Sequence, residues 1–248
     1  MKHLTAVFIG TALIALTPMA SWALTPGTGI AGTPHDWSAT NGVGACTFCH
    51  TPHKAVVTQL LWNHTLSTNS FSWDAATTTA GTTFPTFKGD TYKGPTAKCL
   101  SCHDGSVAIG DVAWWDEGKP AAPLNGLKHP DGDPYNIGFG GNLKGNHPVA
   151  MPYPYNNAAN TYNGVTTGAG AVLSEWVANP TTNNIRLFTD DGAGNVKAGA
   201  TAGQTGMECS TCHDPHNKAS TGDFFLRGSP VGNTAGAGGY ICLSCHVK

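Results

Sequence analysis

The feature that most constrains this chain is a five-residue pattern, Cys-x-x-Cys-His, that occurs four times. The copies begin at Cys46, Cys99, Cys209 and Cys242, and together they use all eight cysteines of the 248-residue chain. In each copy two thiols stand three positions apart, and an imidazole follows the second thiol directly. This is the attachment pattern of c-type haem, in which the thiols form thioethers with the porphyrin and the histidine binds the iron.

Three other interpretations of paired cysteines exist: zinc sites with four cysteines, a set of disulfides, and redox-active Cys-x-x-Cys pairs. None of them requires a histidine directly after every pair. The sequence therefore predicts four covalently bound haem c groups, held by Cys46, Cys49, Cys99, Cys102, Cys209, Cys212, Cys242 and Cys245. The iron ligands within the motifs would be His50, His103, His213 and His246.

An iron with two histidine ligands needs a second imidazole on its far side, called the distal ligand. His53 and His216 follow the first and third motifs at the same spacing, and each comes directly after a proline. His147 precedes a proline in a glycine-rich segment, and Asp36 can orient the ring of its neighbour His35 through the second nitrogen. We expect four distal ligands, with His64 and then His129 in reserve: His35, His53, His147 and His216.

The composition predicts an unusual interior. Only 11% of the residues are charged, glycine is abundant, and the leucine-rich periodicity of long helices is missing. We therefore expect a fold that is mostly coil, wrapped around a stacked row of four haems. Short helices should end at the Cys-x-x-Cys-His motifs, a few short strands should be present, and the helix content should be well below one third. A hairpin is predicted where residues 185–189 alternate, residues 191–194 turn and the chain returns from Val196.

The first 23 residues read as a secretory signal peptide, with a basic start, an apolar run, and small residues at Ser21 and Ala23. The rest, 24–248, is predicted to be one tetrahaem domain without a membrane span. It contains a duplicated two-haem unit, 46–103 and 209–246, in which each half starts with C-x-x-C-H-x-P-H and closes with C-L-S-C-H. Residues 104–208 are an insertion between the halves.

The signal peptide predicts a secreted protein, extracellular or at the cell surface, with the periplasm as the alternative. Attachment of c-type haem outside the cytoplasm fits this location. The formal charge of −2 is not the basic footprint of a nucleic-acid-binding protein, so nucleic acid is not expected as a partner.

The segments CTFCHTPH, LWNH, CLSCHDG, NHPV, CSTCHDPH and CLSCH resemble the doubled C-x-x-C-H multihaem c-type cytochromes. Within that group the chain is most similar to the extracellular tetrahaem cytochromes that polymerise into conductive filaments, the cytochrome nanowires. The resemblance spans His35 to His246. It implies two histidines on every iron, a continuous haem row, and one distal histidine donated across the interface between subunits. By position that donor is His53, with His35 as its substitute.

The expected function is extracellular electron transfer through four haems, as the subunit of a filament and not as an enzyme. The partners would be copies of the same chain, head to tail, and upstream and downstream redox proteins. A monomeric periplasmic shuttle is one alternative. A multihaem reductase is another, and it would need one iron without a distal ligand. Ligation by Met151 or Met207 is the competitor to histidine ligation.

Overall fold

The computed structural model describes residues 25–41, 44–53, 55, 59–73, 92, 94–113, 127–158, 161–162, 165–166, 173–191 and 195–247. The predicted signal peptide and part of the predicted insertion lie outside these residues. The helical elements are α1 (Ser38–Asn41), η1 (Gln59–Leu61), α2 (Pro95–His103), η3 (Phe139–Gly141), η4 (Tyr155–Asn157), η5 (Leu173–Glu175), η6 (Thr182–Asn184), α3 (Cys209–Cys212), η7 (Asp223–Phe225) and η8 (Ile241–Ser244). The strands are β1 (Met151–Pro152), β2 (Thr161–Tyr162), β3 (Val165–Thr166), β4 (Phe188–Asp190), β5 (Val196–Ala198) and β6 (Thr205–Met207).

A helical turn leads into each motif histidine, as predicted. The second motif lies in α2, which starts with a proline at its first helical position and ends at His103. The third motif forms α3, and the fourth forms η8. In the first motif a single turn is closed by the bond from the His50 amide to the Cys46 carbonyl, at 2.9 Å. Only α2 is longer than the single turn that the sequence predicts.

One small antiparallel sheet has the strand order β1-β6-β4-β5, and β2 and β3 form a second pair. The predicted hairpin is confirmed, because β4 pairs antiparallel with β5 and Thr189 faces Lys197. Residues 192–194 of its turn lie outside the described part. All four strands of this sheet belong to the predicted insertion, and β6, which pairs with β1, ends just before the third motif.

In the part of the chain that the structure describes, the buried apolar side chains form three small clusters rather than one large core. One contains Tyr92, Ala150, Tyr162, Phe188 and Val196; a second contains Phe71, Trp73, Leu100 and Leu143; the third contains Tyr153, Leu187, Met207 and Cys245. Met207 is thus packed among apolar side chains, and Met151 faces it across the sheet. Small, separate clusters match a fold in which side chains alone do not fill the interior.

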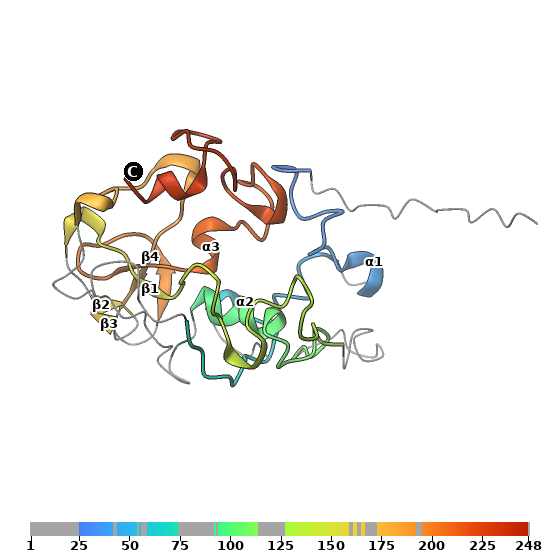
Figure 1. Cartoon of the computed structure of the whole chain (residues 1–248). Helices are drawn as coiled ribbons and strands as arrows, with labels where there is room; N and C mark the ends of the chain where they lie inside the picture. The colour runs from blue at the N-terminus through green and yellow to red at the C-terminus, as the bar shows by residue number, and fades with distance from the viewer. Residues whose placement is uncertain are drawn as a thin grey trace, which may run out of the picture.

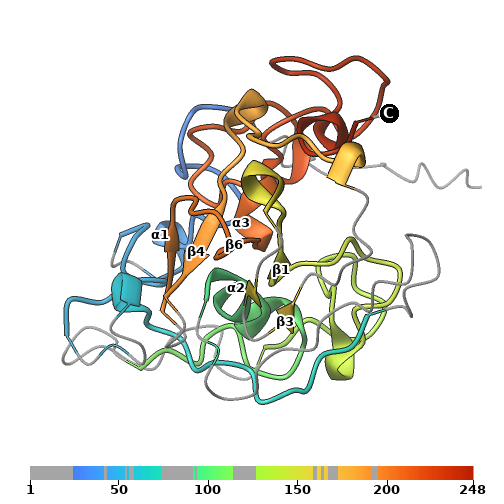
Figure 2. The same cartoon turned by 90° about the vertical axis from the view of Figure 1, so that its left-hand side faces the viewer.

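The helices α2 and α3 lie side by side in the middle of the molecule (Figures 1 and 2). The segment that follows Thr25 packs against the loop after the third motif. There the Asn217 side chain donates hydrogen bonds to the carbonyls of Thr25 and Gly29, at 2.8 and 3.1 Å. This contact places His35 beside the third motif. No helix in the described part of the chain is long and apolar enough to span a bilayer.

Candidate haem-binding sites

All eight cysteines carry free thiols. Burial raises the pKa of Cys49 to about 11 and that of Cys102 to about 12. A redox-active Cys-x-x-Cys pair needs a lowered thiol pKa, so these thiols do not have that character. In the described residues, no three His, Cys, Asp or Glu side chains converge as a metal site would require. The thiols are therefore not arranged as four-cysteine zinc sites.

The thiols of successive motifs lie next to one another. Cys99 and Cys209 are in direct side-chain contact, and two further pairs are close enough for their charges to interact: Cys49 with Cys102, and Cys212 with Cys242. Motifs one to four therefore follow each other in space in the order of the sequence. A porphyrin on each motif would have its neighbours on the preceding and following motifs.

Three of the motif histidines use the same ring nitrogen for a hydrogen bond to the backbone. Their Nδ1 atoms donate to carbonyl oxygens as follows: His50 to Leu60 at 2.6 Å, His103 to Tyr135 at 2.7 Å, and His213 to Phe224 at 2.7 Å. A histidine that binds a metal usually donates its other N–H in this way, which fixes the ring orientation and the tautomer. The lone pair of Nε2 is then available for an iron ligand bond.

A short antiparallel bridge holds three motifs in the same way. The carbonyl of the second cysteine accepts a backbone hydrogen bond in each: Cys49 from Asn63 at 3.0 Å, Cys212 from Arg227 at 2.9 Å, and Cys245 from Val177 at 2.9 Å. The residue before each donor forms a bridge with the motif histidine. We call this arrangement the motif clamp. The clamps of motifs one and three agree with the internal repeat, and the clamp of motif four was not predicted.

Two of the motif clamps contain consecutive residues in the left-handed backbone conformation. They are Leu60 and Leu61 at the first motif, with φ of 61° and 52°, and Phe224 and Phe225 at the third, with φ of 55° and 59°. This conformation costs a residue with a side chain roughly 1–2 kcal/mol. The carbonyls of Leu60 and Phe224 are the acceptors for the motif histidines. Backbone strain thus occurs where it orients a predicted iron ligand.

Three motif histidines face a second histidine ring at similar distances. The ring centroids are 6.1 Å apart for His50 and His216, 6.1 Å for His103 and His35, and 6.3 Å for His246 and His147. Two imidazoles bound to opposite sides of one metal, with metal–nitrogen bonds of about 2 Å, have centroids roughly 6.3 Å apart. The three pairs therefore have the spacing that a shared iron requires. His35, His147 and His216 are distal ligands predicted from the sequence.

Burial also keeps His35 in the form that binds metal. Its pKa is lowered to about 4, first by burial and then by the nearby His103. Burial likewise lowers the pKa of His103, His213 and His216. Neutral imidazole is the ligand form of histidine, so these rings need lose no proton at neutral pH to bind iron.

His129 lies closer to a motif histidine than its rank in the sequence analysis suggests. Its ring is parallel to that of His103, within 7°, with the centroids 5.6 Å apart. Its Nδ1 contacts the carboxylate of Asp133 at 3.0 Å. One sequence signal could have raised its rank, because His129 is followed by Pro130 just as His147 is followed by a proline. The 6.1 Å pair of His103 with His35 fits a shared iron better.

His64, the first reserve ligand, is hydrogen-bonded to the backbone through Nε2 and not through Nδ1. It is buried, and its Nε2 lies 2.6 Å from the carbonyl oxygen of Ile109. The nitrogen that an iron would need is therefore engaged by the backbone. His53, by contrast, is exposed. Among the described residues, neither His53 nor His213 has another histidine ring in contact.

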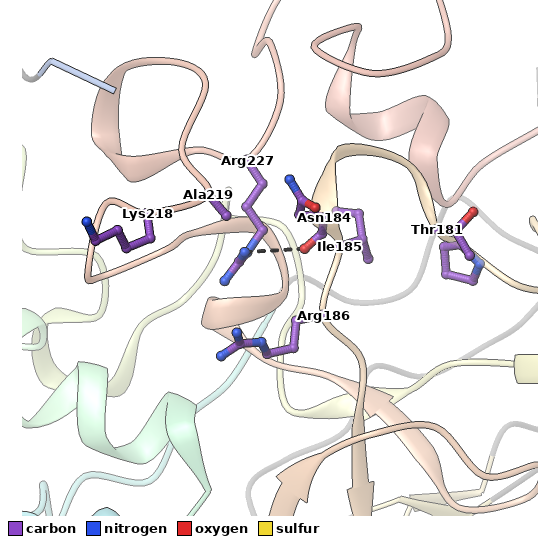
Figure 3. Close-up of a pocket in the computed structure, with 8 residues that line it drawn as sticks. Thr181, Asn184, Ile185, Arg186, Lys218, Ala219 and Arg227 are labelled. Carbon is purple, nitrogen blue, oxygen red and sulfur yellow. Dashed lines mark hydrogen bonds between the residues drawn. The ribbon is translucent and has the colours of Figure 1, made fainter. Parts of the chain in front are cut away.

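A basic pocket adjoins the third motif. It has a volume of about 640 Å³ and is lined in part by Arg186, Lys218 and Arg227. Figure 3 shows the Arg227 guanidinium between the other two cations, donating to the Asn184 carbonyl at 3.3 Å. Arg227 is 1% exposed, and its Nη2 makes no hydrogen bond in the described residues.

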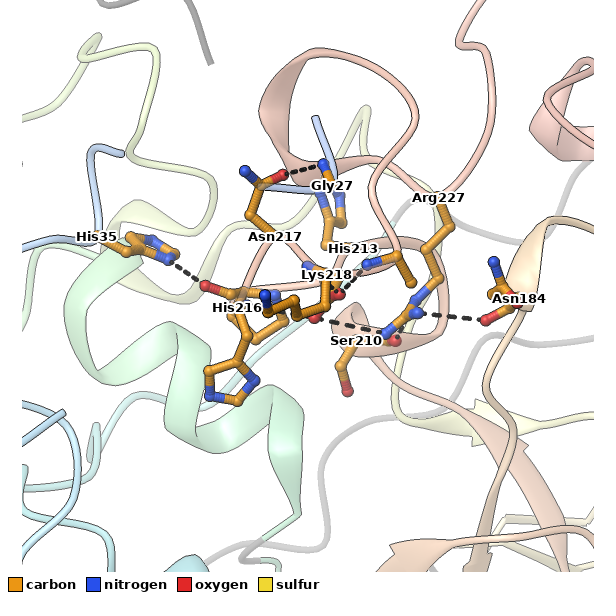
Figure 4. Close-up of polar contacts among 12 residues, drawn as sticks. Gly27, His35, Asn184, Ser210, His213, His216, Asn217, Lys218 and Arg227 are labelled. Carbon is orange, nitrogen blue, oxygen red and sulfur yellow. Dashed lines mark hydrogen bonds and ion pairs between the residues drawn. The ribbon is translucent and has the colours of Figure 1, made fainter. Parts of the chain in front are cut away.

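Figure 4 places this guanidinium close to His213 and His216. The nearest acid is Asp214, whose Oδ1 lies 3.9 Å from Nη2. A buried guanidinium with one nitrogen that makes no hydrogen bond, beside a predicted iron ligand, suits a group that brings carboxylates, as a haem does with its propionates. The thiols, the freed Nε2 atoms, the paired rings and this cation all fit haem.

A scan against models of protein families finds no match to this chain, and a search of curated proteins also finds none.

Proposed function

We propose that this chain is an electron-transfer protein that binds four haem c groups, each iron ligated by two histidines. The observation that carries the proposal is the spacing of the histidine pairs, 6.1, 6.1 and 6.3 Å between centroids, together with the Nδ1 hydrogen bonds that orient His50, His103 and His213. Three motif histidines have a second histidine within the chain, and a histidine from a neighbouring subunit at His213 would leave no open coordination position for a substrate. This favours electron transfer over the reductase alternative.

Bound haem would supply a one-electron couple at each site. The chain's own residues would hold and orient the group: each cysteine pair would attach it, and each motif histidine would bind its iron. Three motif histidines keep their proton on Nδ1, because that atom donates to the carbonyl of Leu60, Tyr135 or Phe224. Nε2 would therefore be the ligand atom. The order of the thiols supports a row in which electrons move from each haem to the next along the sequence.

The internal repeat supports assembly into a filament. His216, in the second half, faces the first motif of the first half through its pair with His50. His53 is the equivalent residue of the first half, yet it is exposed and does not contact the first motif of the second half, that of His213. If the same relationship continues from copy to copy, His53 of one subunit binds the iron of His213 in the next. His35 then serves His103, and His147 serves His246.

The surface near His53 supports a contact between subunits. Leu60 and Leu61 of the first motif clamp are 56% and 47% exposed. Exposed apolar side chains beside an unused ligand mark an interaction site. A contact between two different surfaces of the same chain propagates head to tail and forms a helix unless it closes into a ring. We therefore propose an extracellular filament, with redox proteins at its two ends.

The first experiment measures the mass and the ferric spectrum of the purified protein. Four added haem groups and wholly low-spin iron are expected. A high-spin fraction of about one iron in four in the assembled protein would favour the reductase, because it indicates an open coordination site. Fewer than four haems would reject the proposal.

The second experiment images His53→Ala and His64→Ala by electron microscopy. His53→Ala should retain four haems, lose the filaments and show one high-spin iron in four, because the third iron loses its distal ligand. His64→Ala is the matched control, and it should form filaments. Normal filaments from His53→Ala would reject this donor. Wild-type protein that is monomeric with all irons low-spin would identify the shuttle instead.

A further inference from the structure

Glu208 is a carboxylate enclosed between the second and third motifs. Its side chain is 1% exposed, and it directly precedes Cys209. A fully buried carboxylate without a cation in ion-pair contact is costly unless donors surround it. The proposed electron transfer assigns no role to this residue.

Four donors face the Glu208 carboxylate. The hydroxyl of Tyr92 donates to one oxygen, and the hydroxyl of Tyr162 donates to the other. The Thr96 amide donates to Oε2 at 2.8 Å, and the Thr211 amide donates as part of a capping box. Hydrogen bonds to the charged form of an acid favour that form. The hydrogen bonds therefore favour the charged form of Glu208, against the effect of burial.

Two glycines make room for the tyrosines. A Cβ at Gly94 would lie 2.4 Å from the hydroxyl oxygen of Tyr92, and a Cβ at Gly206 would lie 2.4 Å from the ring of Tyr162. A side chain at either position would displace the tyrosine that donates to Glu208. The arrangement thus depends on the sequence at several separate positions.

The Glu208 carboxylate is hydrogen-bonded to the helices of both the second and the third motif. Through Thr96 it bonds to the first turn of α2, and through Thr211 it bonds to α3. The Cys209 amide also donates to Thr96 Oγ1 at 3.1 Å, and the thiols of Cys99 and Cys209 are in contact. One charge is therefore fixed beside the attachment points of two groups.

Other charged and titratable groups face this site. Lys98 of α2 is buried near Glu208, and burial lowers its pKa to about 8. Asp190 of β4 acts on Tyr162, and Arg227 acts on Cys212 at the other end of α3. Burial raises the pKa of Glu208, and the hydrogen bonds from Thr96, Tyr162 and Tyr92 oppose that rise.

We propose that Glu208 lowers the reduction potential of the haems on the second and third motifs, because its buried negative charge opposes the addition of an electron to either iron. This inference rests on the proposed function. Charges interact strongly where water is excluded, so one fixed carboxylate can act on both neighbours. The two central haems would then be harder to reduce than the same haems without it.

The test is a spectroelectrochemical titration of Glu208→Gln, with dithionite as reductant and redox mediators. Above neutral pH, part of the four-haem titration curve should move to higher potential. We expect a shift of about tenfold in the reduction equilibrium, or 59 mV for a one-electron couple. Asp191→Asn removes an exposed carboxylate from the β4–β5 turn and should leave the curve unchanged.

If Glu208 only capped α3, Glu208→Gln would change the melting temperature but not the reduction potential. The difference between Glu208→Gln and wild type should shrink as the pH falls and the wild-type carboxylate takes up a proton. Tyr162→Phe keeps the carboxylate and removes one donor, so it should move this pH dependence upward. It also serves as the test if Glu208→Gln does not accumulate.

Unchanged potentials at every pH, in variants with four low-spin haems, would overturn the role of Glu208 alone. Missing haems or high-spin iron in the wild-type protein would instead overturn the proposed function.

Discussion

The ring of Trp176 packs against the ring of His246, with the centroids 4.6 Å apart. Trp176 comes from the segment that the sequence analysis treats as an insertion, and it also forms the backbone bridge of the fourth motif clamp. The same segment supplies His147, which faces His246, and Tyr135, which accepts the proton of His103. Residues 104–208 therefore contribute side chains and carbonyls to two of the proposed haem sites instead of only separating two halves.

His147→Ala should leave the fourth iron without its distal ligand. We expect four haems by mass and a high-spin signal from one iron in four, measured by electron paramagnetic resonance. His64→Ala should remain wholly low-spin, because the Nε2 of His64 bonds to Ile109. A fully low-spin spectrum from His147→Ala would show that the 6.3 Å pair does not share an iron.

The two neighbours of His103 can be separated by a pair of variants. His35→Ala should produce one high-spin iron in four, because the His35–His103 pair has the spacing of a shared metal. His129→Ala should keep all irons low-spin, since its ring is held by Asp133. If the two spectra are exchanged, His129 is the ligand and His35 packs on Phe225.

Replacing Leu60 by glycine should stabilise the folded chain. The φ of 61° strains a leucine but not a glycine, and this side chain is 56% exposed. Leu60→Gly should raise the free energy of unfolding of the haem-loaded subunit by about 1 kcal/mol, measured with denaturant.

The matched control is Leu127→Gly, at a residue that is similarly exposed, 51%, but has no positive φ. It should lower the free energy of unfolding. Equal losses from both variants would argue against strain at Leu60.

Lys98 should make stability depend on alkaline pH. Its pKa falls from 10.5 to about 8 on folding, because burial disfavours the charged ammonium group. Between these values the unfolded chain binds more protons than the folded one, so the free energy of unfolding rises with pH. Below about pH 8 both states are protonated and this dependence ends. Lys98→Met should lack the rise, measured as the difference from wild type in denaturant titrations between about pH 8 and 10.

The sequence predicted the features that depend on local spacing. The turn at each motif and the β4–β5 hairpin follow from short patterns, and the structure contains them. The haems, the export and the filament remain predictions. The pairing of distal with motif histidines could not be predicted, because His50 and His216 come together through contacts far apart in the chain.

Two residues show why local patterns were insufficient. His64 sits in a segment that resembles a ligand site, yet the distant carbonyl of Ile109 occupies its nitrogen. In the sequence, Glu208 is an ordinary charged residue before a cysteine. Tyr92 and Tyr162, which donate hydrogen bonds to it, come close only in the folded chain. Neither environment leaves a signal in neighbouring residues.

Because the chain is synthesised from its N-terminus, the motif clamps can form in a definite order. The first clamp is complete once Asn63 is present, and the third once Arg227 is present, while the fourth uses Val177, made before its motif. The backbone bridge of His50, His213 and His246 can thus form soon after each histidine is synthesised. His216 comes much later in the chain than His50, so under the proposed ligation a haem on the first motif would gain its second ligand only after the third motif has been made.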